Sequence, residues 1–544
     1  MNGAGAIAQS LKLAGVEVIF SLSGNQIMPI YDACIDVRIR IVHVRHEAAA
    51  VYMADAYAQL TGGIGVALLT AGPGFANGLS PLCSARAAES PVVLISGDAP
   101  VSGDGNGAFQ EMDQIGVTKP IVKLALRPMT SDALVPDLTR CVRTALSRRR
   151  GPVHLALPFD LLNAEHSEPL DDLQINADLL VETQLLDEQT ARRIAERVGR
   201  SDRPLILVGP QHNRSRSPKL VAALEEAFNI PVIAMESPRG LRDPALGAFA
   251  EILAEADLVI SIGKAIDFTL GFARPPAIGE RTAMIVIDPD PAQHEQARKH
   301  AEDRIIIAAQ ADAGAAMEAL IAIVLSDGIR EGDPAWVSDV REALSHRVDE
   351  PIAGDRATPQ QICEAANRVL AKASDPILIC DGGEFGQWAQ ACCSAPTRVI
   401  NGVLGAIGGG LCYALAAKIA RPDATVAVLM GDGTAGFHFS EFDTAAREST
   451  DFLAIIGNDF RWNAEHQIQL RDYGPERLIG CELSSVARYD KAAEGLGCHG
   501  AHVDRPANLD AAFAAALASG KPACLNVEMD GLAAPTVVRR NQAG

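Results

Sequence analysis

The chain has 544 residues, 48% of them hydrophobic, with 47 glycines and a formal net charge of −20. This length is too great for one hydrophobic core and predicts three domains of roughly 150–200 residues each. The negative charge argues against nucleic-acid binding and against an anionic membrane surface, because both need clustered basic residues. No apolar run reaches about 18 residues, and the N-terminus lacks a basic signal-peptide region, so we expect a cytoplasmic protein with no membrane partner.

The first third of the chain alternates helical patterns with short apolar runs. A helix over 4–15 and a strand precede a turn that holds Asn25 and Gln26. A further strand over 39–44 is followed by Arg45-His46-Glu47, which opens an alanine-rich helix. A carboxylate at such a strand-to-helix turn is placed to meet a ligand, although Glu47 could also simply complement the helix dipole.

Later strands of the same third end in glycine-rich or polar turns. The run 65–70 leads into Ala71-Gly72-Pro73-Gly74-Phe75-Ala76-Asn77, and the segment Phe109-Gln110-Glu111-Met112-Asp113 follows the strand and turn at 91–98. A strand at 151–158 closes the domain, and a polar linker follows it. Because parallel strands of an α/β sheet open on one edge, these turns are candidate ligand contacts.

The middle of the chain, residues 187–340, also alternates strands with helices. Apolar runs at 204–209, 231–235, 258–263 and 283–288 predict a six-stranded Rossmann-like domain. It contains no GxGxxG sequence, so the dinucleotide fingerprint is absent.

The last third begins after a polar connector near 326–358. It contains two strand-to-turn junctions that carry carboxylate side chains. The run 425–430 breaks into Gly431-Asp432-Gly433, and the run 452–456 breaks into Gly457-Asn458-Asp459, with a helical pattern between them. In a βαβ unit both junctions open on the same edge, so the two carboxylates share one crevice. Such a pair suits Mg²⁺ carrying a phosphate group, whereas the simpler interpretation is a tight turn and a helix cap.

Taken together, these motifs resemble the thiamine diphosphate fingerprint of the superfamily that includes acetolactate synthase, benzaldehyde lyase and pyruvate decarboxylase. The resemblance rests on RHEAAA, TAGPGFAN, FQEMD and GDG followed by Asn-Asp, and it covers almost the whole chain. It implies an α/β protein of three doubly wound parallel-sheet domains: a pyrimidine-binding domain over 1–165, a central domain over 187–340 and a diphosphate-binding domain over 358–544. It also implies a homodimer or homotetramer, because each cofactor is expected to span two subunits.

The resemblance assigns roles to particular residues. Asp432 and Asp459 would bind Mg²⁺ through their side chains and Arg461 through its backbone carbonyl. Many relatives have Asn at the position of Asp459, and a carboxylate there is an equally sound ligand. Glu47 would hydrogen-bond the aminopyrimidine ring and so promote formation of the C2 ylide. Further cofactor contacts would come from Gly72, Pro73, Asn77, Gly383, Gly405, Ile407, Gly431, Gly433 and Thr434, with Ile407 as an apolar wedge under the thiazolium.

Three amides are predicted to contact the substrate. Benzaldehyde lyase has a histidine where this chain has Gln26, so Asn25 and Gln26 resemble substrate contacts, and Gln110 matches a glutamine that faces the active centre in the family. An amide cannot transfer protons at neutral pH, but it can hold a carbonyl or hydroxyl oxygen. Glu384 and His466 are weaker candidates, and for His466 a surface helix position is the plainer interpretation.

The implied reaction makes or breaks a carbon–carbon bond beside a carbonyl of an acyloin, a 2-keto acid or a 2-hydroxyacyl-CoA, through an ylide and an enamine. An acetolactate synthase-type condensation is the alternative. The FAD segment of acetolactate synthases is replaced here by residues 263–272, so we expect no FAD, while ADP or CoA stays open and Arg539 and Arg540 could contribute to a CoA site. A non-catalytic nucleotide-binding regulator is disfavoured because Glu47, Asp432 and Asp459 are retained.

Overall fold

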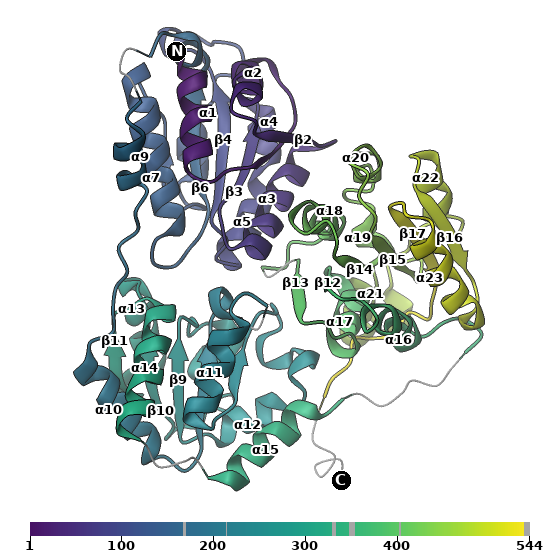
Figure 1. Cartoon of the computed structure of the whole chain (residues 1–544). Helices are drawn as coiled ribbons and strands as arrows, with labels where there is room; N and C mark the ends of the chain where they lie inside the picture. Colours follow the sequence, from purple (N-terminus) through teal and green to yellow (C-terminus); the bar gives the residue numbers. More distant parts are fainter. Residues whose placement is uncertain (167–169, 214, 329–332, 348–353, 402–403, 538–544) are drawn as a thin grey trace. The chain divides into compact units, whose positions relative to one another are not determined.

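The strands of the chain form three separate sheets in the computed structural model, which describes residues 1–166, 170–213, 215–328, 333–347, 354–401 and 404–537 (Figure 1). The first sheet has six strands in the order β2-β1-β3-β4-β6-β5, and all of its pairings are parallel. Its strands are β1 Val18–Ser21, β2 Arg40–His43, β3 Gly65–Leu69, β4 Val92–Asp98, β5 Ala125–Leu126 and β6 Val153–Pro158.

The third sheet repeats this topology with the order β13-β12-β14-β15-β17-β16. Its strands are β12 Pro376–Cys380, β13 Thr397–Ile400, β14 Thr425–Gly431, β15 Leu453–Asn458, β16 His499–Val503 and β17 Ala523–Glu528. In both sheets the strand order reverses within the sheet, between β1 and β3 and between β12 and β14. Ligands of open α/β sheets bind at such a reversal, beyond the carboxyl ends of the strands.

The central sheet has the order β11-β10-β9-β7-β8, again with parallel pairings. Its strands are β7 Pro204–Val208, β8 Val232–Ala234, β9 Leu258–Ile262, β10 Ala283–Ile287 and β11 Ile305–Ala309. The expectation of six strands is wrong, because the described chain beyond β11 continues as the helices α14 Ala313–Asp327 and α15 Pro334–Ser345. The predicted class, three parallel-sheet α/β domains, is confirmed.

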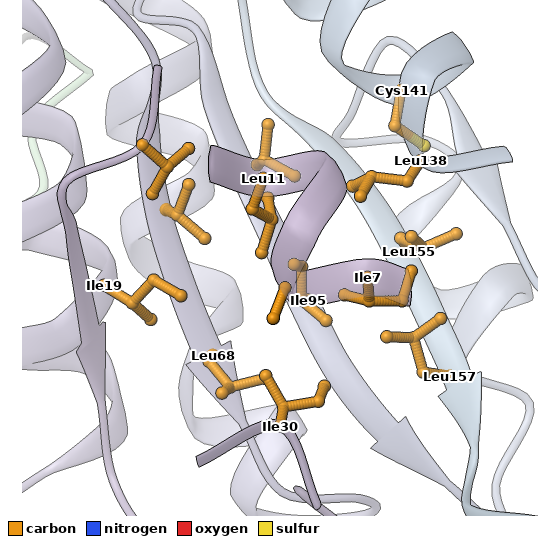
Figure 2. Packing of buried hydrophobic residues seen from close by; sticks show 14 of the residues in the cluster. Ile7, Leu11, Ile19, Ile30, Leu68, Ile95, Leu138, Cys141, Leu155 and Leu157 are labelled. Atoms are coloured by element: carbon orange, nitrogen blue, oxygen red, sulfur yellow. The ribbon is translucent and has the colours of Figure 1, made fainter. Parts of the chain in front are cut away.

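An apolar core fixes the strands that carry the first set of turns. Helices α1 (Gly3–Leu13) and α7 (Leu134–Leu146) pack on one face of the first sheet through Ile7, Leu11, Leu138 and Cys141, as Figure 2 shows. Their partners on the strands include Ile19, Leu68, Ile95, Leu155 and Leu157 (Figure 2). All nine side chains are at most 1% exposed, and burying each aliphatic one contributes about 1.5–3 kcal/mol to stability. The strand ends, and the turns that follow them, are therefore held on a rigid support.

The other face of this sheet buries one histidine. His154 of β6 lies 2.8 Å from the hydroxyl of Ser96 through Nε2 and 2.9 Å from the hydroxyl of Thr118 through Nδ1. Its ring stacks on Phe75, with centroids 4.8 Å apart. Phe75 belongs to α4 (Pro73–Asn77), the helix that follows β3. The histidine thus packs against the helix that follows the glycine turn. Burial lowers the pKa of His154 to about 3.

This histidine predicts an acid-sensitive stability. Because the folded protein holds His154 neutral, with its pKa lowered from about 6.5 to about 3, its contribution is complete above pH 6.5 and is lost as the pH falls towards 3. The loss amounts to about 1.4 kcal/mol per pH unit in that range. In thermal denaturation followed from pH 7 to pH 4.5, the melting temperature of wild type should fall more steeply than that of His154→Gln. Parallel curves for the two proteins would contradict this.

The chain divides into two compact units. The first comprises residues 1–181, 353–386 and 401–532 and the second comprises 182–352, 387–400 and 533–544. The motifs from Gln26 to Asn77 and from Gly405 to Asp459 all lie in the first unit. Arg539 and Arg540 lie outside the described residues. Among those described, no helix combines the length and the apolar character needed to cross a membrane.

Candidate cofactor site

The turn after β1 and the turn after β3 meet in a chain of side-chain hydrogen bonds. Thr70 Oγ1 donates to Gln26 Oε1 at 2.7 Å, and Gln26 Nε2 donates to Gln110 Oε1 at 2.7 Å. Gln26 is buried, while the other two are half-buried. Because Gln110 uses its carbonyl oxygen towards Gln26, its NH₂ group stays available to donate elsewhere. The structure therefore joins two predicted residues directly and adds Thr70 at the other end of Gln26. Sequence reasoning missed Thr70, although it stands between β3 and the glycine turn.

Close backbone packing holds this chain of bonds in place. A Cβ at Gly72 would lie 3.0 Å from Cβ of Gln110, and one at Gly24 would lie 2.3 Å from Cβ of Thr70. Gly72 also has φ +57°, a conformation that other residues rarely adopt. Pro73 is exposed at the start of α4, and Asn25 is exposed at the first position of the 3₁₀ helix η1 (Asn25–Ile27). Of the three predicted amides, the structure brings Gln26 and Gln110 together and leaves Asn25 at the surface.

Glu47 is the first residue of α3 (Glu47–Thr61), just beyond the end of β2. Asn77 Nδ2 donates to Glu47 Oε2 at 3.0 Å, so one predicted cofactor contact orients the other. Glu47 Oε1 lies 3.3 Å from where a Cβ of Gly74 would be, and the same Cβ would lie 2.5 Å from the Thr70 methyl. Glu47 Oε2 is therefore held by the Asn77 amide, whereas Oε1 lies beside the glycine turn and Thr70.

The carboxylate pair lies at the matched ends of β14 and β15. Gly431 pairs with Gly457 in the sheet, so Asp432 and Asp459 follow at one edge. Both residues are 3% exposed, and Oδ2 of each has no hydrogen-bond partner. Burial, reinforced by the charge of Asp459, raises the pKa of Asp432 to about 7, and burial raises the pKa of Asp459 to about 6. Two buried carboxyl groups, each with one unpartnered oxygen and one of them raising the pKa of the other, are costly unless a cation neutralises them.

The connection between these strands differs in detail from the single predicted helix. It consists of two short helices, α19 (Asp432–Ala435) and α20 (Glu441–Arg447). The first places Gly433 where a Cβ would lie 2.7 Å from the ring of Trp462. Thr434 Oγ1 donates to the carbonyl oxygen of Gly431 at 2.9 Å and so closes the turn.

A buried aspartate at the end of β12 organises the second glycine turn. Asp381 is fully buried, and its carboxylate accepts hydrogen bonds from the Asn401 side chain (2.8 Å) and from the backbone N–H groups of Gly382 (2.6 Å), Gly408 (3.1 Å) and Gly410 (2.9 Å). These bonds fold the turn back onto β12, where Cγ2 of Ile407 lies 2.1 Å from the position of a Gly382 Cβ. A side chain at Gly382 would displace Ile407. Sequence reasoning selected Ile407 but missed Asp381, although its place before two glycines at a strand end was the available signal.

The remaining predicted glycines lie at the same junctions. Gly405 and Gly383 have φ near +82° and +81°, which explains the residue type at both positions. Gly383 starts α17 (Gly383–Cys392), and its Cβ would lie 4.0 Å from the Thr434 methyl. The turns after β12 and β14 therefore lie side by side, as the pairing of these two strands requires.

Three further candidates surround Asp459. Arg461 Nε donates to the carbonyl oxygen of Asp459 at 3.2 Å, and the positive charge of Arg461 favours the ionised form of Asp459. Glu384 is buried, and its charge raises the pKa of Asp459. His466 lies on α21 (Asn463–Tyr473) but is only 9% exposed, so its expected surface position is wrong. Burial lowers its pKa, and its Nδ1 has no hydrogen-bond partner.

The donor set fits a magnesium ion that also carries a phosphate group. The described residues contain no group of three or more His, Cys, Asp or Glu side chains able to enclose a metal by themselves. Mg²⁺ is commonly held by one or two carboxylates together with phosphate oxygens and water, and the unpartnered Oδ2 atoms of Asp432 and Asp459 supply that number. The glycines around them allow a ligand to approach the backbone closely.

Comparison with known proteins matches three parts of the chain to the three domains of one enzyme family. Residues 1–117 match the thiamine pyrophosphate enzyme N-terminal TPP binding domain, residues 191–320 match the central domain, and residues 381–527 match the C-terminal TPP binding domain. The chain is 30% identical to the acetolactate synthase large subunit IlvG of Mycobacterium tuberculosis, over 97% of this chain and 96% of that protein. It is 30% identical to 2-hydroxyacyl-CoA lyase 2 of Danio rerio (93% and 87% covered) and 31% identical to that of Bos taurus (93% and 85% covered).

The similarity therefore extends over all three domains and includes the strand ends described above. The central matched region contains the whole second sheet, and the two TPP binding regions contain most strands of the first and third sheets. The N-terminal region includes Glu47, and the C-terminal region includes Asp432 and Asp459. The protein belongs to the thiamine pyrophosphate enzymes.

Proposed function

We propose that this protein is a Mg²⁺- and thiamine diphosphate-dependent lyase or carboligase that acts beside a carbonyl group. Residues 1–165 form the pyrimidine-binding domain, 187–340 the central domain and 358–544 the diphosphate-binding domain. The enzyme works in the cytoplasm as a homodimer or homotetramer. Its central domain carries no FAD, a view supported by the local bonding of Lys264, whose ammonium group donates to Asp267 and Thr269 within the segment that replaces the FAD pattern. ADP or CoA is a candidate ligand of the chain.

One observation carries this proposal: the buried pair Asp432 and Asp459, each with an unpartnered Oδ2 at the edge where the strand order reverses. Asp432 Oδ1 accepts the backbone N–H of Gly433 at 2.9 Å, as the simpler interpretation of a turn requires, but that interpretation gives no role to the two buried Oδ2 atoms. Two acceptors left over, with raised pKa values, are what a divalent cation requires. Asp432 and Asp459 would hold the cation, with the backbone carbonyl of Arg461 as a further ligand.

The other residues bind and orient. When bound, thiamine diphosphate supplies a carbon nucleophile that adds to carbonyl groups. Glu47 would accept a hydrogen bond from the aminopyrimidine through Oε1 while Asn77 holds Oε2. Gly72, Pro73, Gly383, Gly405, Gly431, Gly433 and Thr434 would allow the cofactor to approach the backbone, and Ile407 would support its ring. Gln110 would donate its NH₂ group to a substrate oxygen, since Thr70 and Gln26 fix its carbonyl oxygen, and Asn25 would contact the outer part of the substrate.

The substrate class follows from the lyase relatives and the absence of the FAD pattern: a 2-hydroxyacyl thioester or an acyloin is cleaved, or is formed in the reverse direction. Purified enzyme with thiamine diphosphate and Mg²⁺ should convert at least one of pyruvate, benzoin, formyl-CoA with a ketone, or oxalyl-CoA, as detected by mass spectrometry. Asp432→Asn, as the matched control, should give less than about 1% of that product because it weakens the metal site. Turnover of none of these by wild type, or equal turnover by the variant, would contradict the proposal.

A second candidate reaction is the condensation of two 2-keto acids to an acetohydroxy acid. It is favoured by the similarity to the mycobacterial acetolactate synthase subunit, which covers nearly the full length of both chains. The product screen separates the two: acetolactate from pyruvate alone supports the condensation, whereas an aldehyde or ketone released from a thioester or acyloin supports the lyase.

A further inference from the structure

A buried glutamate of the diphosphate-binding domain contacts the backbone next to Glu47. Glu441, the first residue of α20, is 0% exposed. Its Oε1 accepts a hydrogen bond from the backbone N–H of Arg45 at 2.9 Å, and Thr444 Oγ1 donates to its Oε2 at 2.7 Å. Arg45 stands two residues before Glu47, where the chain leaves β2 and turns into α3. The carboxylate therefore holds the segment that aims the Glu47 side chain.

Two other side chains of α20 contact the same segment, residues 43–45, at the protein surface. Arg447 Nη2 donates to the carbonyl oxygen of His43 at 2.6 Å, and Asp443 lies 3.5 Å from the Arg45 guanidinium. These side chains are 30–55% exposed, and ion pairs at such exposure contribute little. The Glu441 contact is the fully buried one, and a buried hydrogen bond is costly to break because the N–H left behind has no water to replace its acceptor. It is therefore the contact in α20 with the greatest hold on the segment.

A second link runs from the same segment to the turn of Ile407. The ring of His46 meets that of His438 edge-on, with centroids 5.7 Å apart. His438 Nδ1 lies 2.7 Å from the carbonyl oxygen of Gly408, the residue after Ile407. The segment that precedes Glu47 thus contacts α20, which lies between Asp432 and Asp459 in the sequence. Through His438 it is also linked to the turn that Asp381 organises.

We infer that Glu441 is a positioning residue, which accepts the Arg45 N–H and so fixes the start of α3 and the carboxylate of Glu47 relative to the diphosphate-binding domain. The consequence for catalysis rests on the role proposed for Glu47. The hydrogen bond between Glu441 and the Arg45 backbone does not depend on that role, and it can be measured in the protein without cofactor.

The test compares three substitutions of Glu441 with a control on the same helix. Glu441→Gln keeps an acceptor oxygen at the same reach, Glu441→Asp keeps the charge but withdraws it by one methylene, and Glu441→Ala removes both. Asp443→Asn is the matched control, because its side chain contacts the Arg45 guanidinium and not the backbone. Amide hydrogen exchange of a peptide spanning residues 40–50, in the full-length protein without cofactor, reports the bond directly.

Glu441→Ala should speed exchange in this peptide by about tenfold or more and lower kcat about 10–100-fold with KM within about threefold, the range typical of residues that orient a functional group. Glu441→Gln and Asp443→Asn should stay within about threefold of wild type in exchange and in kcat. If Glu441→Ala does not fold, Glu441→Asp carries the same test, because the shorter side chain cannot reach the Arg45 N–H.

Unchanged exchange in Glu441→Ala and Glu441→Asp would overturn the inference, as would a Glu441→Gln variant impaired as severely as Glu441→Ala. Failure of the proposed function looks different. In that case Glu47→Gln retains wild-type turnover, whereas the exchange result still decides whether Glu441 holds the Arg45 backbone.

Discussion

Glu47→Gln is expected to lower kcat by a factor of about 10²–10⁴ while leaving thiamine diphosphate binding within about threefold of wild type. Gln has the same size and can still be held by Asn77, whose Nδ2 donates to Glu47 Oε2 at 3.0 Å. It cannot, however, act as an ionised acceptor for the aminopyrimidine. Exchange of the cofactor's C2 proton for deuterium, followed by NMR, should slow in parallel with kcat.

Asn77→Ala is the milder variant for comparison with Glu47→Gln. It leaves the Glu47 carboxylate in place but removes the amide that orients it. Since a hydrogen bond to a charged group contributes about 1.5–3 kcal/mol, kcat should fall about 10–100-fold, less than in Glu47→Gln. Wild-type exchange of the C2 proton in Glu47→Gln would refute the role of Glu47, whatever the result for Asn77→Ala.

Asp432→Asn should raise the apparent Kd of thiamine diphosphate at fixed Mg²⁺ by about 100-fold or more. The variant keeps the shape of the site but removes one of the two charges that face the metal, and a buried charged contact of this kind is worth several kcal/mol. The same change should stabilise the cofactor-free protein, because it removes a buried carboxylate and its repulsion with Asp459, the two causes that raise the pKa of Asp432. Calorimetric titration and thermal denaturation without cofactor check the two effects.

Asp459→Asn is the matched comparison for this pair. An Asn side chain still offers an amide oxygen to the metal, and the resemblance places Asn at this position in many relatives. The apparent Kd should therefore rise by no more than about tenfold. Equal losses in Asp432→Asn and Asp459→Asn, or retention of wild-type affinity in Asp432→Asn, would count against the assignment of the ligands.

Much of the fold could be predicted because each strand is a short apolar run that ends in a glycine or polar turn. The run at 65–70 and the run at 425–430 match β3 and β14 to within a residue. The edge strand β11 was missed although its residues, IIIAA, form a continuous apolar run, because periodicity alone does not distinguish so short a run from part of a helix. The six-strand expectation for the central domain came from a fold template, and the chain beyond β11 does not supply the strand.

The site was predicted less completely, for a physical reason. Residues that would meet the cofactor through a motif, such as Glu47, Asp432 and Ile407, stand out by spacing and by the glycines around them. Thr70, Asp381 and Glu441 act through contacts with residues about 20 to 400 positions away in the chain, and no local pattern marks such partners. His466 illustrates the converse, because its helical position alone did not reveal that only 9% of the residue is exposed.

The measurement that tests the central claim most directly is a calorimetric titration of thiamine diphosphate into the wild-type protein with and without Mg²⁺. We predict saturable heat with Mg²⁺ present and a loss of at least about tenfold in affinity when the ion is removed with a chelator, because the phosphate oxygens would then face the unneutralised Asp432 and Asp459. No heat of binding in the presence of Mg²⁺, or binding of equal affinity without it, would contradict the account.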